Sequence, residues 1–169
     1  MSDLVVRQLT APDAAAFRAI RLEGLQTNPE AFGSTYEAEK DRPIESFVES
    51  LSKSHMAGAF VDGALLGVAG YYVLAGPKLA HRANIWGVYV RPADRGKGLG
   101  RAIISHLLEA AATQVKQVHL SVVTDNAPAV RLYEQLGFRT YGTEPRSLMA
   151  GGRYYDEYLM VRRLDGPVA

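Results

Sequence analysis

The stretch that constrains this chain most is an apolar strand that runs through a glycine-rich basic turn into a helix, over residues 88–101. Pro92 ends the strand because it cannot donate a hydrogen bond to a neighbouring strand and restricts the residue before it. Three glycines at alternate positions, Gly96, Gly98 and Gly100, let bare backbone approach a ligand. The helix that follows leaves its first N–H groups free at the positive end of its dipole. The stretch therefore predicts a backbone cradle, meaning a binding site for a polyanion, and the expected ligand is a pyrophosphate.

Glycine spacing separates the ligands that such a turn could bind. A P-loop needs two glycines five positions apart followed by Lys and Ser or Thr, and the chain has no such run. A dinucleotide-binding turn needs G-x-G-x-x-G, and neither register of this turn supplies the third glycine. The turn instead reads Arg-x-x-Gly-x-Gly at Arg95, Gly98 and Gly100. A glycine-rich loop without a ligand is the remaining alternative, which three glycines and three cations within residues 95–101 disfavour.

Length, charge and cysteine content exclude several classes of function. At 169 residues the chain is long enough for one well-buried core and short for two, so we expect a single domain over residues 1–169. A formal net charge of +1 gives no reason to expect a nucleic-acid partner. The chain has no cysteine, and its four histidines are far apart in the sequence, so we expect no metal site. The sequence shows neither a signal pattern nor an apolar run of roughly 18 residues, so we expect a soluble cytoplasmic protein that binds no membrane.

The hydrophobic pattern alternates between strand and helix periods and predicts an α/β fold. Seven strands are expected, at residues 4–9, 56–61, 64–74, 81–91, 115–124, 138–149 and 154–164. Four helices are expected, at residues 10–26, 43–53, 98–113 and 125–137. Gly87 indicates a bulge in the fourth strand, and Pro145 an interruption of the sixth. The usual right-handed crossover would make the fifth strand parallel to the fourth.

A second motif lies downstream of the glycine turn, between Asn126 and Phe138, and reads Asn-Ala, then Leu-Tyr, then Gly-Phe. Together with the motif formed by Arg95, Gly98 and Gly100, it closely resembles the signatures of the GNAT superfamily of N-acetyltransferases. The resemblance covers nearly the whole chain. It implies an α/β (α+β) fold with a mixed central sheet of about seven strands, splayed between strands four and five and flanked by about four helices.

The resemblance implies acetyl-CoA as cosubstrate and transfer of its acetyl group to a primary amine. The absence of cysteine implies that this transfer is direct, without a covalent enzyme intermediate, and no metal is expected. The pantothenate arm would enter the gap between the splayed strands, and the amides of the glycine turn would hold the pyrophosphate. The residues that would bind acetyl-CoA are Val88, Tyr89, Val90, Arg95, Gly96, Lys97, Gly98, Leu99, Gly100, Arg101 and Asn126. Asn126 would cap the helix, hold the cofactor arm, or do both.

Tyr133 is the catalytic residue that the resemblance implies. Its hydroxyl would lie beside the thioester sulfur and donate a proton to the leaving thiolate, and the alternative is packing as the aromatic of a short amphipathic helix. The proton acceptor is less evident. Many relatives carry a glutamate on the fourth strand, but residues 81–93 contain no acid, and Trp86-Gly87 stands where that glutamate is often found. The candidates are His81, Asn84, Glu23, Asp156 and Glu157, or deprotonation directly into solvent.

In the fold that the resemblance implies, the acceptor amine enters a groove that here lies between residues 27–39 and residues 144–153. The charged side chains of these two walls include Glu30, Glu37, Glu39, Arg146 and Arg153. The acids would suit an amine that arrives as a cation, and the two arginines would suit a carboxylate. A small molecule that carries both groups, such as an amino acid, or the N-terminus of a peptide or protein, therefore fits better than a polyamine. A solvated surface is the alternative for all of these charges.

Two other functions compete with acetyl transfer. A non-catalytic acyl-CoA-binding sensor would explain the missing acid on the fourth strand, but not the intact Tyr133. A nucleotide-binding oxidoreductase could use Asp125 as a ribose ligand, although the glycine spacing is wrong and the chain leaves no room for a substrate domain. The expected partner is thus a small-molecule or peptide amine, and a homodimer is allowed.

Overall fold

One sheet of seven strands runs through the protein, and the computed structural model describes residues 3–166. The strand order is β1-β2-β3-β4-β5-β7-β6. Neighbouring strands are antiparallel except β4 and β5, which are parallel, as the crossover rule predicts. In chain order the strands are β1 (Leu4–Gln8), β2 (His55–Val61), β3 (Ala64–Val73), β4 (Arg82–Val90), β5 (Gln117–Val123), β6 (Arg139–Ala150) and β7 (Arg153–Arg163).

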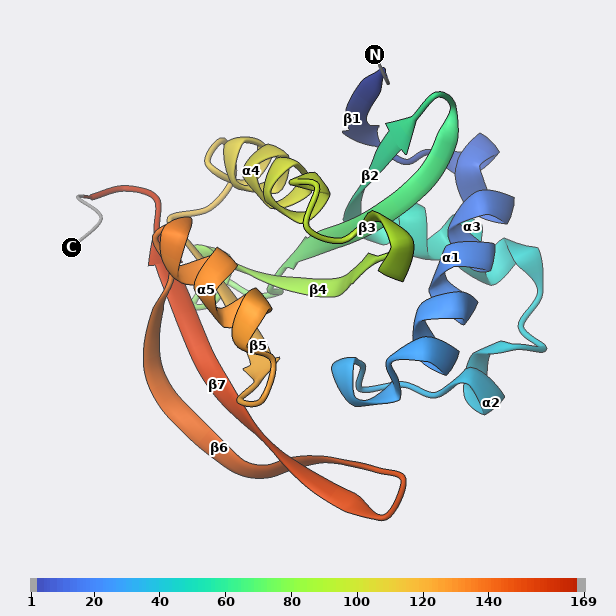
Figure 1. Cartoon of the computed structure of the whole chain (residues 1–169). Helices are drawn as coiled ribbons and strands as arrows, with labels where there is room; N and C mark the ends of the chain where they lie inside the picture. The colour runs from blue at the N-terminus through green and yellow to red at the C-terminus, as the bar shows by residue number, and fades with distance from the viewer. Residues whose placement is uncertain (1–2, 167–169) are drawn as a thin grey trace.

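Helices cover the two faces of the sheet (Figure 1). The α-helices are α1 (Ala14–Thr27), α2 (Tyr36–Glu39), α3 (Ile44–Lys53), α4 (Leu99–Ala111) and α5 (Ala127–Gln135). On one face α4 and α5 bury apolar side chains such as Ile103 and Tyr133 against the sheet. On the other face α1 and α3 meet edge to face through Phe17 and Phe47, whose ring centroids are 6.1 Å apart. None of the helices within residues 3–166 combines the length and apolar composition that crossing a membrane requires.

The fourth and fifth strands pair over a short stretch and then part. Their paired residues are Arg82 with Gln117, Ala83 with Val118, and Asn84 with His119. Beyond this seam β4 continues to pair with β3 only, and its register with β3 shifts where Gly87 adopts a φ of 66°. A positive φ is accessible to glycine because it has no Cβ, so Gly87 supplies the bulge that the sequence predicted. The expected splay between strands four and five is confirmed.

Two elements differ from the prediction. The sixth strand is a single element, β6, but its pairing with β7 is interrupted where the sequence predicted, because the register shifts between Glu144 and Leu148. A shifted segment at the edge of a sheet needs no ladder bond from proline, so Pro145 is tolerated there. The described residues also form five α-helices rather than four, because α2 adds one short turn after α1. The Thr35 hydroxyl caps α2 by accepting a hydrogen bond from the Ala38 N–H at 3.2 Å.

Candidate functional site

The glycine turn joins β4 to α4 through a single 3₁₀ turn, η3 (Pro92–Asp94). Gly96 and Gly98 have φ values of 76° and 83°, and Gly98 is the N-cap of α4. No heavy atom lies within 4 Å of the position that a Cβ would take at either glycine. Within residues 3–166 the N–H groups of residues 96–101 make no hydrogen bond. The turn therefore presents a row of free donors at the positive end of the α4 dipole, which is the geometry of an anion site.

Each of the three basic side chains of this turn contacts another side chain of the protein. Arg95 donates to the Asn28 side-chain oxygen at 2.6 Å, and its guanidinium lies over the Tyr89 ring. Lys97 pairs with Asp94 at 2.9 Å, and Arg101 donates to a side chain of α5. Each of the three cations thus has a partner within the protein, and their contact with a polyanion stays a prediction. Backbone amides, rather than free side-chain charges, dominate the cradle.

The second half of β4 offers an unpaired backbone edge to the gap. Val88 and Val90 are half-buried, and Tyr89 is buried with its hydroxyl donating to Glu23 Oε2 at 2.9 Å. The Val90 carbonyl accepts a hydrogen bond from Arg95 Nε at 2.9 Å, which ties the turn to the end of the strand. Because β5 has already turned away, the edge of β4 after Asn84 has no strand partner on that side.

Tyr133 lies on the buried side of α5, with 5% of its surface exposed. Its ring meets Phe138 edge to face at 5.9 Å, and burial raises the pKa of its hydroxyl to about 12. Within the described residues this hydroxyl makes no hydrogen bond. Asn126 caps α5, because its side-chain oxygen accepts from the Ala129 N–H at 3.3 Å. The cap was one of the two roles expected for Asn126.

A groove of about 260 Å³ opens where β4 and β5 part, on the face opposite α4 and α5. Its polar lining residues include Tyr72, Asn84, His119, Ser121 and Tyr141. Sequence reasoning named Asn84 but missed His119. Burial, and then the positive charges of Arg82 and His81, lower the pKa of His119. The missed signal is the alternation along β5, where buried Val118, Leu120 and Val122 put the residues between them on the groove face.

The environment of His119 holds its ring in place. Its Nδ1 lies 3.3 Å from the Tyr141 hydroxyl, and its Nε2 lies 2.7 Å from the Gln117 side-chain nitrogen. In the neutral ring one of these nitrogens carries the proton and the other can accept one, and which does which depends on the tautomer. Both ring nitrogens of His119 thus lie within hydrogen-bond distance of a neighbouring side chain.

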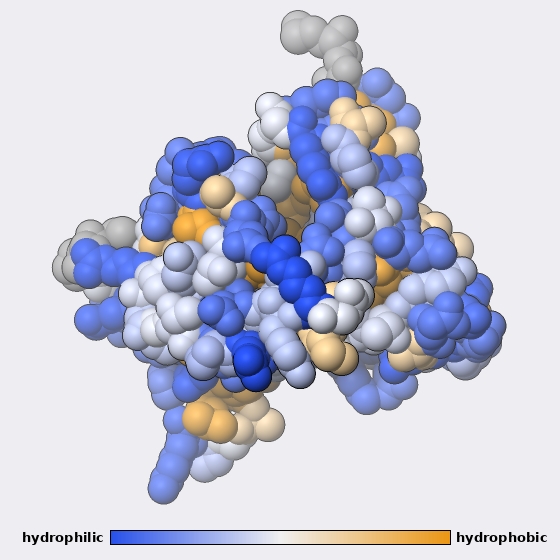
Figure 2. Space-filling model, turned by 60° about the horizontal axis from the view of Figure 1, so that its bottom comes forward, coloured by the Kyte–Doolittle hydropathy of each residue, from blue (hydrophilic) through white to orange (hydrophobic). Residues whose placement is uncertain are grey.

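The face that Figure 2 turns forward is largely hydrophilic, with hydrophobic residues visible at the bottom of a furrow. The short 3₁₀ turn after α1, η2 (Pro29–Ala31), contacts both β5 and β6 at this side of the molecule. The two walls predicted for the acceptor groove therefore do approach each other. Most of their charged side chains, however, already contact other residues of the protein. Arg153 pairs with Asp125 at 2.5 Å, and the Arg146 guanidinium lies 4.8 Å from the centre of the Tyr154 ring.

The acids of the first wall have protein partners as well. Glu37 pairs with Lys40 at 2.6 Å, and Glu30 accepts from Asn28 at 3.2 Å. Glu39 is buried against Arg21. Within the described residues each acid of this wall thus has a protein partner, and its contact with a cationic amine stays a prediction.

The remaining candidates for the proton acceptor are also engaged or remote. The Glu23 carboxylate accepts from Tyr89, Asp156 accepts from the Arg146 N–H at 2.8 Å, and Glu157 accepts from Ser147 at 2.5 Å. His81 is exposed and precedes β4, before the seam with β5.

Two histidines that are distant in the sequence meet in space. His55 of β2 and His106 of α4 approach to 3.3 Å between their Nε2 atoms, and His55 stacks on Tyr71. Burial, and then the charge of His106, lower the pKa of His55. In the part of the chain that the structure describes, no third His, Cys, Asp or Glu joins them closely enough to hold a metal ion. The sequence separation did not predict this contact.

Known proteins share this architecture. The model of the Acetyltransferase (GNAT) family matches residues 21–138. Over 166 residues the chain is 26% identical to the L-amino acid N-acetyltransferase AaaT of Escherichia coli, covering 96% of this chain and 99% of that protein. Over 125 residues it is 29% identical to the spermidine N(1)-acetyltransferase of Vibrio cholerae, covering 69% and 72%.

A solved structure shows the same fold. It is a putative acetyltransferase from Salmonella typhimurium with its cofactor acetyl-CoA, and it matches with a TM-score of 0.86 over 99% of this chain and 98% of that chain, at 22% identity. The family model spans most of the chain, including the parted strands, the glycine turn and α5. The chain therefore belongs to the GNAT family of acetyltransferases.

Proposed function

We propose that this protein transfers the acetyl group of acetyl-CoA directly to the primary amine of an amino acid. The observation that carries the proposal is the open edge of β4 beyond Asn84, which leads to the free amides of residues 96–101. An extended, amide-bearing arm with a pyrophosphate at one end complements both features. The family membership favours an enzyme over the non-catalytic sensor.

The cofactor-binding roles follow from this arrangement. The backbone of Val88, Tyr89 and Val90 would hold the pantothenate arm, and the free amides of residues 96–101 would hold the pyrophosphate. Gly96 and Gly98 fit this role, because a Cβ at either position would stand in space that is empty in the protein. Asn126, exposed beside the gap, would add a donor through its side-chain nitrogen while its oxygen caps α5.

In the chemical step the neutral amine attacks the thioester carbonyl, the carbon–sulfur bond breaks, and the amine loses a proton. Backbone N–H groups at the Gly87 bulge would stabilise the negative charge that develops on the carbonyl oxygen. The Tyr133 hydroxyl would donate to the departing sulfur. Since burial raises its pKa to about 12, the phenol stays protonated and available as a donor. A thiol has an ordinary pKa of about 8.5, which lies below that of the Tyr133 hydroxyl. The hydroxyl therefore stabilises the developing thiolate by donating a hydrogen bond to it, before any full proton transfer.

We propose His119 as the group that takes the amine proton, through water in the groove. It lies at the seam where β4 and β5 part and lines the groove on the acceptor face. Its lowered pKa keeps the ring neutral at neutral pH, as a proton acceptor must be. Tyr133 and His119 would then act from opposite faces of the sheet. Tyr133 would donate to the sulfur, and His119 would accept the proton of the amine.

Replacing His119 by Gln should lower kcat/KM at neutral pH by roughly 10² and flatten the acidic side of its pH profile. In the unmodified protein kcat/KM should fall as pH drops through the pKa of His119, which lies below the ordinary value of about 6.5, because protonation removes the acceptor. Titration of the substrate amine affects both proteins alike, so the difference between the two profiles isolates the histidine. Identical profiles would assign the proton to solvent.

The proposed reaction itself is tested by CoA release from acetyl-CoA with amino acids, peptides, polyamines and aminoglycosides as acceptors. We expect release with amino acids, and calorimetric binding of acetyl-CoA but not of NAD. Turnover of polyamines alone would overturn the amino-acid assignment, and tight binding without turnover of any amine would favour the sensor.

A further inference from the structure

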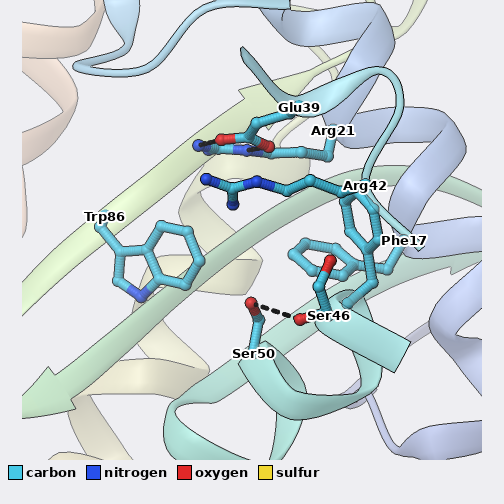
Figure 3. A pocket seen from close by; sticks show the side chains of 8 residues that line it. Phe17, Arg21, Glu39, Arg42, Ser46, Ser50 and Trp86 are labelled. Atoms are coloured by element: carbon cyan, nitrogen blue, oxygen red, sulfur yellow. Dashed lines mark hydrogen bonds and ion pairs between the residues drawn. The ribbon is translucent and has the colours of Figure 1, made fainter. Parts of the chain in front are cut away.

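A small pocket lies between the sheet and the helices α1 and α3, beside the bulge of β4 (Figure 3). Its volume is about 50 Å³. A single water needs roughly 10–15 Å³ on the same measure, so the pocket has room for a group of about three or four heavy atoms, the size of a carboxylate. Among the residues that line it, Arg21 and Arg42 carry guanidinium groups and Glu39 carries a carboxylate.

Arg21 is fixed at the inner end of this pocket. Its Nε and Nη2 donate to the two Glu39 carboxylate oxygens at 3.1 and 2.9 Å, and the side chains are 10% and 5% exposed. Burial alone would raise the pKa of Glu39, but the hydrogen bonds and charge of Arg21 outweigh it and the pKa lies below its ordinary value. The guanidinium also lies 5.1 Å from the Phe32 ring centre and 5.4 Å from that of Trp86. The pair is therefore charged and rigid.

One nitrogen of Arg21 remains unused and faces the bulge. Its Nη1 makes no hydrogen bond within residues 3–166, and it lies 3.6 Å from the position that a Cβ would take at Gly87. Gly87 is also where β4 leaves its register with β3. An anion that received a hydrogen bond from this nitrogen would sit next to the backbone where the acetyl group is expected.

Arg42 gives the pocket a surplus of positive charge. Its guanidinium lies alongside that of Arg21 (Figure 3), and among the described residues its side chain has no hydrogen bond or ion pair. Two arginines face one glutamate, so a single positive charge is uncompensated. Trp86 lines the pocket with its ring, and within the described residues its Nε1 is buried without a hydrogen-bond partner. Such a buried donor is costly unless a ligand or water satisfies it.

We propose that this pocket binds the carboxylate of the acceptor, so that the protein acetylates α-amino acids. The inference rests on the proposed acetyl transfer and names the substrate class of that site. In an α-amino acid the amine and the carboxylate are carried by one carbon, so a carboxylate held by Arg21 and Arg42 brings the amine to Gly87. A polyamine has no carboxylate and would meet an uncompensated positive charge.

Trp86 makes the pocket directly observable, because it is the only tryptophan of the chain. Titration with amino acids should change its fluorescence, and the carboxamide and the decarboxylated amine of each responding amino acid should bind at least about tenfold more weakly. In steady-state assays the same series should show at least about a tenfold loss of kcat/KM when the carboxylate is absent. A response that is equal for all three compounds would overturn the pocket assignment.

Arg42→Gln is the variant of choice, since Arg42 is exposed and its loss leaves no buried acid unpaired. We expect about a tenfold rise in KM for the amino acid, little change in kcat, and no change for its carboxamide. Arg139→Gln removes the same charge from an exposed position of β6 and serves as the control. Equal losses in both variants, or for both substrates, would contradict the inference.

Arg21→Lys tests the inner end of the pocket. Thermal melting and acetyl-CoA calorimetry show whether the variant is folded. It keeps the charge beside Glu39 but removes the forked geometry, so the fluorescence response to amino acids should weaken about tenfold. The two proposals fail in different ways. CoA release without a fluorescence response to amino acids would reject the pocket alone, and a fluorescence response without CoA release would reject acetyl transfer alone.

Discussion

Tyr133→Phe should lower kcat by about 10² while the melting temperature and the affinity for acetyl-CoA stay close to those of the unmodified protein. The substitution removes one oxygen from a ring that is 95% buried and keeps its packing against Phe138. No hydrogen bond within residues 3–166 is lost with that oxygen, so the fold has little reason to change. Steady-state CoA release and calorimetry measure the two effects separately.

Tyr71→Phe is the matched control for this experiment. Tyr71 is 2% exposed on β3, and its hydroxyl accepts from Gln114 at 3.1 Å, away from the gap between β4 and β5. Its loss should reduce stability by about 1 kcal/mol and leave kcat within twofold. Equal turnover by Tyr133→Phe and the unmodified protein would leave Tyr133 as a packing residue and the thiolate as an unassisted leaving group.

Gly98→Val should weaken acetyl-CoA binding at least tenfold, about 1.4 kcal/mol. Gly98 caps α4 at a φ of 83°, and no heavy atom lies within 4 Å of a Cβ built on it. The new side chain would therefore clash with nothing in the protein and would fill the space in front of the free amides. Calorimetric titration with acetyl-CoA measures the loss.

Gly63→Val separates this effect from backbone strain. Gly63 has a φ of 84° in the turn between β2 and β3, and it likewise has no heavy atom within 4 Å of a Cβ. Both variants should lose similar stability, because both force a branched residue into the left-handed region. Only Gly98→Val should lose affinity, and equal affinities in the two variants would show that the turn does not hold the pyrophosphate.

The features that the sequence predicted are local ones. The strand, the glycine turn and α4 follow one another within residues 82–111, and short-range rules for proline, glycine and helix periodicity were enough to place them. Gly87 marked the bulge for the same reason, since a glycine inside a strand is locally conspicuous. The parallel direction of β4 and β5 followed from the crossover rule, and the splay between them from the family resemblance.

The features that the sequence did not predict depend on distant partners. Arg146 and Arg153 looked available for a carboxylate, but the chain folds the first onto Tyr154 and the second onto Asp125. Arg21 and Arg42, which stand in ordinary helical and loop sequence, become neighbours only when α1, α2 and β4 pack together. Charge in a sequence shows neither which ion pairs form nor which cation is left over, because those are decided by tertiary contacts.

The short seam between β4 and β5 has a consequence for the resistance of the folded protein to heat and proteolysis. Within residues 3–166, strands β1 to β4 pair with strands β5 to β7 only through residues 82–84 and 117–119. A molecule that lay along the open edge of β4 would act as a missing strand and brace the two parts against each other. A ligand that binds only the folded state adds about 2.7 kcal/mol at a hundred times its Kd. The supply of acetyl-CoA would then govern the lifetime of the enzyme against heat and proteases as well as its rate.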